Sequence, residues 1–247
     1  MDRLIYIAMT GARNVLAQQA TNSQNLANLN TNGFRAQVDS FRAVPVVGAQ
    51  MPTRTYSVDS TVGTDFRSGV VQTTGRDLDV AINGKGWIAV QGPDGKEAYT
   101  RNGSLQINAN GVLQTRNGLN VLSDSGPISI PPDTEFTIAK DGTISTVPGT
   151  NQKNQVSEIG RLKLVNPPEE NLVRGDDGLF HLKEGNNAPA DDKVFLHSGA
   201  LETSNVNPAE ALVSMINLSR QFDMQMKLLQ NAQQNGAKAS TILNANG

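Results

Sequence analysis

The fold of the N-terminal part is decided by one stretch, Gln24-Asn25-Leu26-Ala27-Asn28-Leu29-Asn30-Thr31-Asn32-Gly33-Phe34-Arg35. It follows a proline-free segment and ends in Asn-Gly, a helix stop signal because glycine readily adopts the left-handed conformation at C′. We therefore expect a helix over residues 3–32 that ends in a Schellman motif. In that register Gly33 is C′, and Leu29 at C3 contacts Phe34 at C″.

Upstream of this stretch, side chains recur at three- and four-residue steps, as on one face of a helix. This stripe consists of Leu4, Ala8, Ala12, Val15, Gln19, Asn22, Leu26 and Leu29. A second helix is predicted over residues 207–232, with an extension to about 243, because Asn207 suits the N-cap, Pro208 position N1 and Glu210 a capping box. The second stripe is Ala211, Met215, Leu218, Phe222, Leu229 and Ala232, with Leu212, Ile216 and Met226 beside it.

The middle of the chain, about residues 35–206, has closely spaced turn signals. They are Asn83-Gly84, Pro93-Asp94-Gly95, Asn102-Gly103, Asn110-Gly111, Asn117-Gly118, Asp141-Gly142 and Asp177-Gly178. The short alternating runs between them predict antiparallel hairpins in a sandwich or barrel-like domain. The fold class expected is thus α+β, with the terminal helices (1–42 and 203–247) paired as a coiled-coil-like domain and a central antiparallel β-rich domain (71–202). We expect an extended connector over residues 43–70.

Composition excludes several functional classes. The chain has 247 residues, no cysteine and a net charge of −2, which rules out disulfides and thiol catalysis and leaves no basic footprint for nucleic acid. No apolar run reaches the ~18 residues that a membrane-spanning helix needs. A cleaved signal peptide is not expected, because the charges of Asp2 and Arg3 cancel and polar Gln18-Gln19 follows soon after the apolar run at residues 4–9.

The two ends carry little charge. The first 30 residues hold three charged side chains and the last 40 hold five, whereas solvated surface helices usually carry many. Their apolar stripes are also too thin to stabilise either helix alone. We expect both ends to be largely disordered in the monomer and to fold together in an assembly.

The sequence contains only weak signals for a catalytic or metal-binding site. Asp176-Asp177-Gly178 lacks the EF-hand pattern and is predicted to be a plain turn, and His181 and His197 stand outside any metal motif. Asp77 and Asp79 would share one face of a strand, without a histidine partner. Asn83-Gly84-Lys85-Gly86 lacks the Walker pattern. We expect that the protein is not an enzyme and that it binds no cofactor and no metal.

Two signatures near the chain ends resemble those of the flagellar rod and hook protein family. The first is Gln24-Asn25-Leu26-Ala27-Asn28 followed by Thr31-Asn32-Gly33-Phe34-Arg35, and the second is Glu202-Thr203-Ser204-Asn205-Val206-Asn207-Pro208-Ala209-Glu210. The similarity extends over essentially the whole chain. Residues 41–46, 52–55, 99–104, 160–165, 174–178 and 224–227 favour a proximal-rod member. Residues 41–61 look unlike the longer connector of the distal-rod protein.

The resemblance implies a structural subunit that polymerises into the tubular proximal rod, transmits torque and encloses the export channel. It places the terminal helices in an inner layer and the β domain outside, in the periplasmic part of the basal body. Implied partners are copies of itself, other proximal-rod proteins, the distal-rod protein and, during secretion without a cleaved signal, the flagellar type III export apparatus. The alternatives are a distal-rod or hook protein, a secreted β-rich adhesin, and a hydrolase on a β scaffold.

Subunit contacts are expected in both signatures and both stripes. A helix end does not explain Asn22, Asn25 and Asn28, because asparagine is a poor helix former. For Glu202, Ser204 and Asn205, a contact with a neighbour and a local role near the helix start are equally open. The expected assembly residues are Leu4, Ala8, Val15, Asn22, Asn25, Leu26, Asn28, Leu29, Gly33, Phe34, Glu202, Ser204, Asn205, Val206, Leu212, Met215, Leu218, Phe222 and Leu229.

Overall fold

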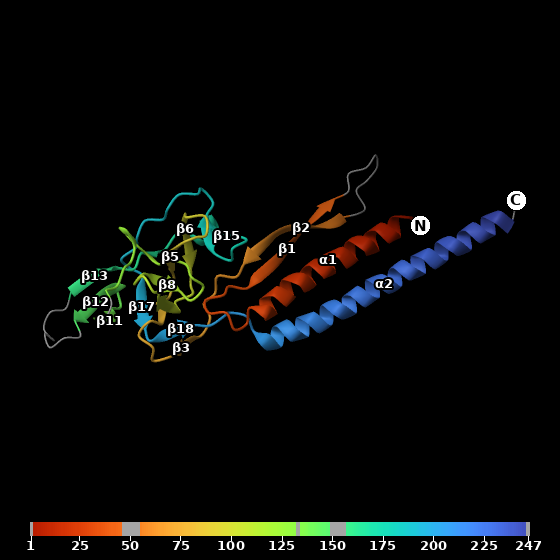
Figure 1. The fold of residues 1–247 in the computed structure, drawn as a ribbon. Coiled ribbons are helices and arrows are strands. Elements are labelled where there is room, and N and C mark those ends of the chain that lie inside the picture. The colour runs from red at the N-terminus through yellow and green to blue at the C-terminus, as the bar shows by residue number, and fades with distance from the viewer. Residues whose placement is uncertain (1, 46–54, 132–133, 149–156, 246–247) are drawn as a thin grey trace. The chain divides into compact units, whose positions relative to one another are not determined.

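The chain folds into two compact units (Figure 1). A computed structural model describes residues 2–45, 55–131, 134–148 and 157–245. Unit 1 comprises Met1–Leu29, Ala36–Asp65 and Val206–Gly247, and unit 2 comprises Asn30–Arg35 and Phe66–Asn205. Both ends of the chain therefore belong to unit 1, and unit 2 is built from two internal segments.

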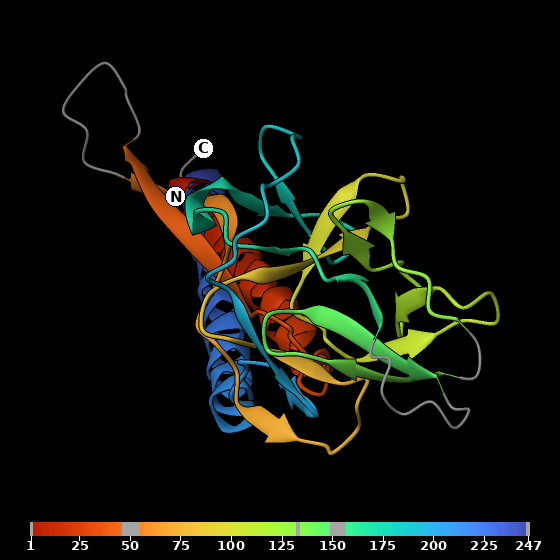
Figure 2. The same ribbon diagram turned by 90° about the vertical axis from the view of Figure 1, so that its left-hand side faces the viewer.

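Unit 1 consists of two helices and a hairpin. Helices α1 (Asp2–Ala27) and α2 (Pro208–Ala245) run antiparallel and side by side, as Figures 1 and 2 both show. Strands β1 (Gln37–Pro45) and β2 (Thr55–Thr64) pair antiparallel and pack against α1. The expectation of an extended connector over 43–70 is corrected here, because hairpin strands occupy part of that range.

The N-terminal helix ends earlier than the sequence predicts. Helix α1 stops at Ala27, and residues 28–33 form turns, whereas a helix to residue 32 was expected. Gly33 does have a positive φ of 69°, but its N–H donates to the carbonyl oxygen of Glu202 (2.8 Å) and closes no Schellman motif. The N–H of Gly33 therefore bonds to Glu202, far along the chain, and not to a carbonyl group at the end of the helix.

The start of α2 follows the prediction. The Oδ1 atom of Asn207 accepts the N–H of Ala209 at 3.0 Å, and the N–H of Glu210 lies 3.4 Å from the same atom. Pro208 is the first helical residue. These bonds satisfy N–H groups that have no partner inside the first helical turn, which is the role of an N-cap.

Unit 2 contains short antiparallel strands, as predicted. A five-stranded sheet has the order β14-β5-β6-β16-β15, a three-stranded sheet has the order β11-β12-β13, and four strand pairs are β3–β18, β4–β17, β7–β8 and β9–β10. The elements are β3 Val71–Thr73, β4 Val80–Asn83, β5 Trp87–Gln91, β6 Glu97–Thr100, β7 Leu105–Ile107, β8 Leu113–Thr115, β9 Leu122–Ser123, β10 Gly126–Pro127, β11 Thr134–Ile138, β12 Thr143–Pro148, β13 Ser157–Arg161, β14 Leu164–Val165, the 3₁₀ helix η1 Glu169–Asn171, β15 Leu172–Arg174, β16 Phe180–Leu182, β17 Phe195–Ser198 and β18 Ala200–Glu202.

Glycine positions fix most of the predicted turns. Glycines with φ between 78° and 88° occupy six of them, at Gly84, Gly95, Gly111, Gly118, Gly142 and Gly178. Gly103 is different. A Cβ atom there would lie 1.7 Å from the carbonyl oxygen of Val80, so close approach of two backbones requires the glycine.

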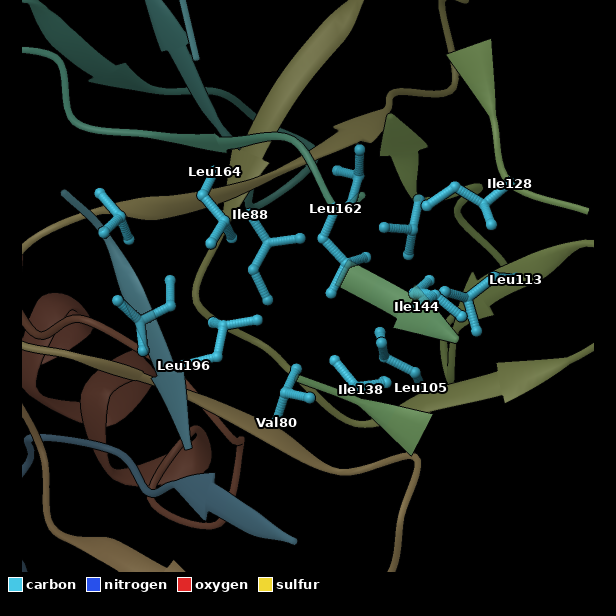
Figure 3. Packing of buried hydrophobic residues seen from close by; sticks show 14 of the residues in the cluster. Val80, Ile88, Leu105, Leu113, Ile128, Ile138, Ile144, Leu162, Leu164 and Leu196 are labelled. Carbon is cyan, nitrogen blue, oxygen red and sulfur yellow. The ribbon is translucent and has the colours of Figure 1, made fainter. Parts of the chain in front are cut away.

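One apolar core holds the sheets of unit 2 together. Side chains from strands far apart in sequence, among them Val80, Ile88, Ile144, Leu162 and Leu196, point toward one another in Figure 3 and are almost fully buried. Burying a Val, Leu or Ile side chain contributes roughly 1.5–3 kcal/mol. This shared core joins strand pairs that would be marginal alone.

Candidate functional site

Two asparagines of α1, Asn22 and Asn25, make specific contacts inside unit 1. The Nδ2 group of Asn22 donates to the carbonyl oxygen of Ala211 in α2 (2.8 Å). Asn25 makes two hydrogen bonds to the backbone of Gln37, and Thr21 donates to Asp39 at 2.7 Å. The poor helix formers in α1 therefore connect it to α2 and to the hairpin. A contact of Asn22 and Asn25 with a neighbouring subunit stays a prediction.

The predicted stripes divide into buried and exposed positions. Ala8 and Val15 on α1 and Leu218 on α2 are buried within unit 1, whereas Leu212 is half exposed. Leu26, Asn28, Leu29, Val206, Met215, Phe222 and Leu229 are partly buried. The side chain of Leu4 lies outside the described part of the structure.

Helix α2 presents large apolar side chains to solvent. Leu212, Val213 and Ile216 are 50%, 58% and 54% exposed, and Met224 and Leu228 continue the series. On α1 the exposed apolar residues are Tyr6, Ile7, Met9 and Leu16. Exposed apolar side chains of this kind are typical of surfaces through which proteins bind partners, and a contact through these residues stays a prediction.

A groove of about 630 Å³ runs along the helix pair. Gln18 of α1 and residues of the first turns of α2, including Val213, Asn217 and Leu218, line it. Amide and hydroxyl side chains alternate there with apolar ones. The groove carries a single charged side chain, that of Glu210, so a partner would meet it mainly through packing and neutral hydrogen bonds.

The two signatures meet inside unit 2. The N–H of Gly33 donates to the carbonyl oxygen of Glu202 (2.8 Å), and the N–H of Asn205 donates to the carbonyl oxygen of Phe34 (3.3 Å). The side-chain amide of Asn205 donates to the carbonyl oxygen of Arg67 (2.9 Å). Backbone hydrogen bonds thus join a turn that precedes the hairpin to a segment that precedes α2.

Glu202 is the centre of a buried ion cluster. Its Oε1 atom lies 2.7 Å from Nη1 of Arg35 and accepts the N–H of Gly69 at 2.9 Å. Its Oε2 atom lies 3.1 Å from Nη1 of Arg101. Exposed fractions of 1%, 1% and 4% for Glu202, Arg35 and Arg101 place all three charges in the interior of unit 2.

Backbone carbonyl groups complete part of the cluster. Arg35 donates to the carbonyl oxygen of Arg67 (2.7 Å), and Arg101 donates to that of Gly84. Burial lowers the pKa of Arg101 to about 10, with Glu202 acting in the opposite direction. Desolvation therefore outweighs the attraction of the single carboxylate, as expected for a buried cation that shares its partner.

The aromatic residue of the first signature packs beside this cluster. The guanidinium group of Arg174 lies 4.5 Å from the ring centroid of Phe34 and donates to the carbonyl oxygen of Arg35 (2.9 Å). The rings of Phe66, Trp87 and Phe180 form a further group, in which Phe66 is partly buried and the centroids of the buried rings of Trp87 and Phe180 lie 4.5 Å apart. Cation–π contacts of this kind contribute about 0.5–2 kcal/mol each.

Sequence reasoning missed two members of the cluster. Arg35 and Arg101 stand in motifs that the sequence analysis quotes, but we did not predict them as site residues. Nothing local distinguishes them from solvated arginines, because their partner Glu202 is remote in sequence.

The weak catalytic and metal candidates have local partners. Asp79 accepts hydrogen bonds from Thr74 and Arg76, and the ring of His181 lies 3.1 Å from Asp177. Within the described residues no group of three or more His, Asp or Glu side chains could hold a metal ion. In the described part of the chain, no helix is both long and apolar enough to cross a membrane.

Two family models match this chain. Residues 81–146 match the flagellar hook protein FlgE/F/G D1 domain, and residues 197–242 match the flagellar basal body rod FlgEFG protein C-terminal region. The first region lies in unit 2. The second contains the signature around Glu202 and most of α2. These matches define the class as flagellar rod and hook proteins.

Full-length relatives narrow the class. The chain is 45% identical over 249 residues to the flagellar basal-body rod protein FlgF of Escherichia coli K12, covering 98% of this chain and 99% of the relative. Identity to FlgF of Salmonella typhimurium LT2 is the same over the same length. FlgG of Buchnera aphidicola subsp. Schizaphis graminum is 31% identical over 261 residues, with 96% of this chain and 98% of the relative covered. The chain belongs to the FlgF family of flagellar basal-body rod proteins, which confirms the resemblance drawn from the two signatures.

Proposed function

We propose that this chain is a structural subunit of the proximal flagellar rod, which polymerises through its helix pair and has no catalytic role. The exposed apolar side chains of α2 carry this proposal. Leu212, Val213 and Ile216 lie on consecutive turns of a 38-residue helix and are each at least half exposed. Family membership gives these side chains a natural partner, the helices of neighbouring rod subunits.

The polar, weakly charged character of the helices fits a place around the export channel. Packing between subunits would cover the apolar side chains, and neutral residues such as Gln18, Ser214 and Asn217 would face passing chains. Neighbours would also supply the packing that the thin stripes lack. The partners proposed are copies of this chain, sister proximal-rod proteins and the distal-rod protein, in the periplasmic part of the basal body.

Secretion by the flagellar type III apparatus, without a cleaved signal peptide, completes the proposal. It rests on the FlgF family and on the weakly apolar N-terminus. Several arginines introduced at exposed positions of α1 should stall export, because they would place charge on the channel wall. Unchanged secretion of such a variant would contradict the channel-lining role.

The central test replaces the exposed side chains of α2. A strain that lacks the native gene should regain motility with the unaltered chain but not with the triple variant Leu212→Gln, Val213→Gln, Ile216→Gln. Because these side chains are exposed, the purified variant should keep the thermal midpoint of the parent. Ser219→Gln, at an exposed position of the same helix, is the matched control and should restore motility. Full motility of the triple variant would refute polymerisation through this face.

A further inference from the structure

The buried cluster of unit 2 contains unequal charge. Glu202 contacts both Arg35 and Arg101, so two guanidinium groups share one carboxylate. All three side chains are at least 96% buried. A buried charge is tolerated only when an opposite charge and hydrogen bonds compensate for lost hydration. Removal of Glu202 would leave two buried cations facing each other.

Compensation in the cluster is incomplete even with Glu202 present. In the part of the chain that the structure describes, Arg35 Nε, Arg35 Nη2 and Arg101 Nε have no hydrogen-bond partner. Each unpaired buried donor destabilises the cluster. The buried arrangement of Arg35 and Arg101 is therefore only marginally stable, and it depends on the carboxylate of Glu202.

The cluster also joins remote segments of the chain. Arg35 ends the segment Asn30–Arg35, which belongs to unit 2 although the residues on both sides of it belong to unit 1. Glu202 ends β18. Backbone hydrogen bonds of Gly33 and Asn205 join the same two segments, so residues 202–205 help to hold the segment 30–35 in unit 2.

We propose that Glu202 is an electrostatic latch that holds the segment 30–35 in unit 2. Without its carboxylate, Arg35 and Arg101 repel each other in a desolvated site, and the segment detaches while the apolar core stays folded. In an exported chain the latch would postpone completion of unit 2 until residue 202 has emerged. That consequence rests on the proposed function, whereas the latch itself rests on the contacts within unit 2.

Amide hydrogen exchange of the purified full-length protein tests the latch. In Glu202→Gln, exchange at Gly33, Gly69 and Asn205 should accelerate at least about tenfold, because breaking a buried ion pair opens the structure locally. Exchange at Ala89, whose N–H donates to the carbonyl oxygen of Lys163 inside unit 2, should be unchanged. Glu184→Gln, at an exposed position of unit 2, is the control and should alter none of these amides.

A charge-balanced variant separates the latch from general destabilisation. Arg35→Gln removes one cation and leaves Glu202 paired with Arg101, so exchange at Gly69 should accelerate less than in Glu202→Gln, and exchange at Ala89 should again be unchanged. The latch is overturned if Glu202→Gln leaves Gly33 protected, or if Arg35→Gln accelerates exchange at Gly69 as much as Glu202→Gln does. If Glu202→Gln does not fold, Arg35→Gln must still fold and lose exchange protection only at residues 30–35. Complete unfolding of Arg35→Gln would also overturn the latch. Motility reports separately on the proposed function.

Discussion

Asn25 and Gln37 form a reciprocal pair of hydrogen bonds in unit 1. The Nδ2 group of Asn25 donates to the carbonyl oxygen of Gln37, and the N–H of Gln37 donates to Oδ1 of Asn25, each over 2.8 Å. A carboxamide is the side-chain group that can satisfy a backbone donor and acceptor together. The pair positions the first residue of β1 against the last turns of α1.

Replacement of Asn25 by alanine should loosen this attachment. Loss of two hydrogen bonds destabilises by about 1–3 kcal/mol, while the better helix propensity of alanine recovers only about 0.5 kcal/mol. Asn25→Asp should be no better, because a carboxylate cannot donate to the carbonyl oxygen of Gln37. Hydrogen exchange of Gln37 measures the effect, and Ser23→Ala, at an exposed position of the same helix, is the control. Unaltered protection of Gln37 in Asn25→Ala would show that the pair contributes nothing.

Gly33 and Gly185 provide a matched pair for a second prediction. Both have φ of 69°, so alanine is strained by the same amount at either position. A Cβ atom at Gly33 would lie 2.3 Å from the carbonyl carbon of Arg101, whereas one at Gly185 would meet nothing within 4 Å.

Gly33→Ala should therefore destabilise unit 2 much more than Gly185→Ala. We expect about 1 kcal/mol for Gly185→Ala and at least about 2 kcal/mol more for Gly33→Ala, because the backbone of Arg101 must move. Urea unfolding followed through the fluorescence of Trp87, in the same unit, gives both values. Equal midpoints for the two variants would mean that the segment 30–35 does not pack as described.

The sequence predicts those parts of the fold whose causes are local. The start of α2 follows from Asn207, Pro208 and Glu210, and the turns of unit 2 follow from their glycines. The end of α1 was misplaced because the hydrogen-bond partner of Gly33 is Glu202, and no local pattern announces a partner so far along the chain. The hairpin β1–β2 was missed because prolines and many Ser and Thr residues resemble a connector.

The candidate site was likewise predicted only in part. The two signatures predicted Gly33, Phe34, Glu202 and Asn205 as site residues, and the structure brings these residues together in unit 2. The cluster itself could not be predicted, since a buried ion pair depends on which side chains the core brings into contact. Arg101 belongs to it only because β6 ends beside the segment 30–35.

Tyr99 should lose its phenol proton only at unusually high pH, and the stability of the protein should therefore fall in alkaline solution. Burial and, as a smaller contribution, the Glu97 carboxylate, which accepts the phenol proton in a hydrogen bond, together raise the pKa of Tyr99 from 10.0 to about 12. From pH 10 to 12 the unfolded chain has lost this proton and the folded chain keeps it. Stability should therefore fall by about 1.4 kcal/mol for each pH unit in that window.

Absorbance at 295 nm checks the titration of Tyr99. The chain has three tyrosines, so one third of the change should appear near pH 12 in the folded protein. In Tyr99→Phe that fraction should disappear, and stability should depend less on pH above 10. A full three-tyrosine transition near pH 10 in folded protein would contradict a buried, hydrogen-bonded Tyr99.

The helix pair supplies the last prediction, which concerns concentration. Helices α1 and α2 have 26 and 38 residues, yet most of the buried side chains that the structure describes on them are alanines, such as Ala8, Ala12 and Ala232. Burying an alanine releases little free energy compared with ordering the backbone around it. In dilute solution, far-ultraviolet circular dichroism should therefore show less helix than these lengths require, and a protease should remove α2 while unit 2 persists. Helicity should rise when the chain is concentrated or mixed with sister rod proteins. A dilute monomer with full helicity and a protected α2 would instead mean that the pair is stable without neighbours, and that polymerisation joins preformed helices.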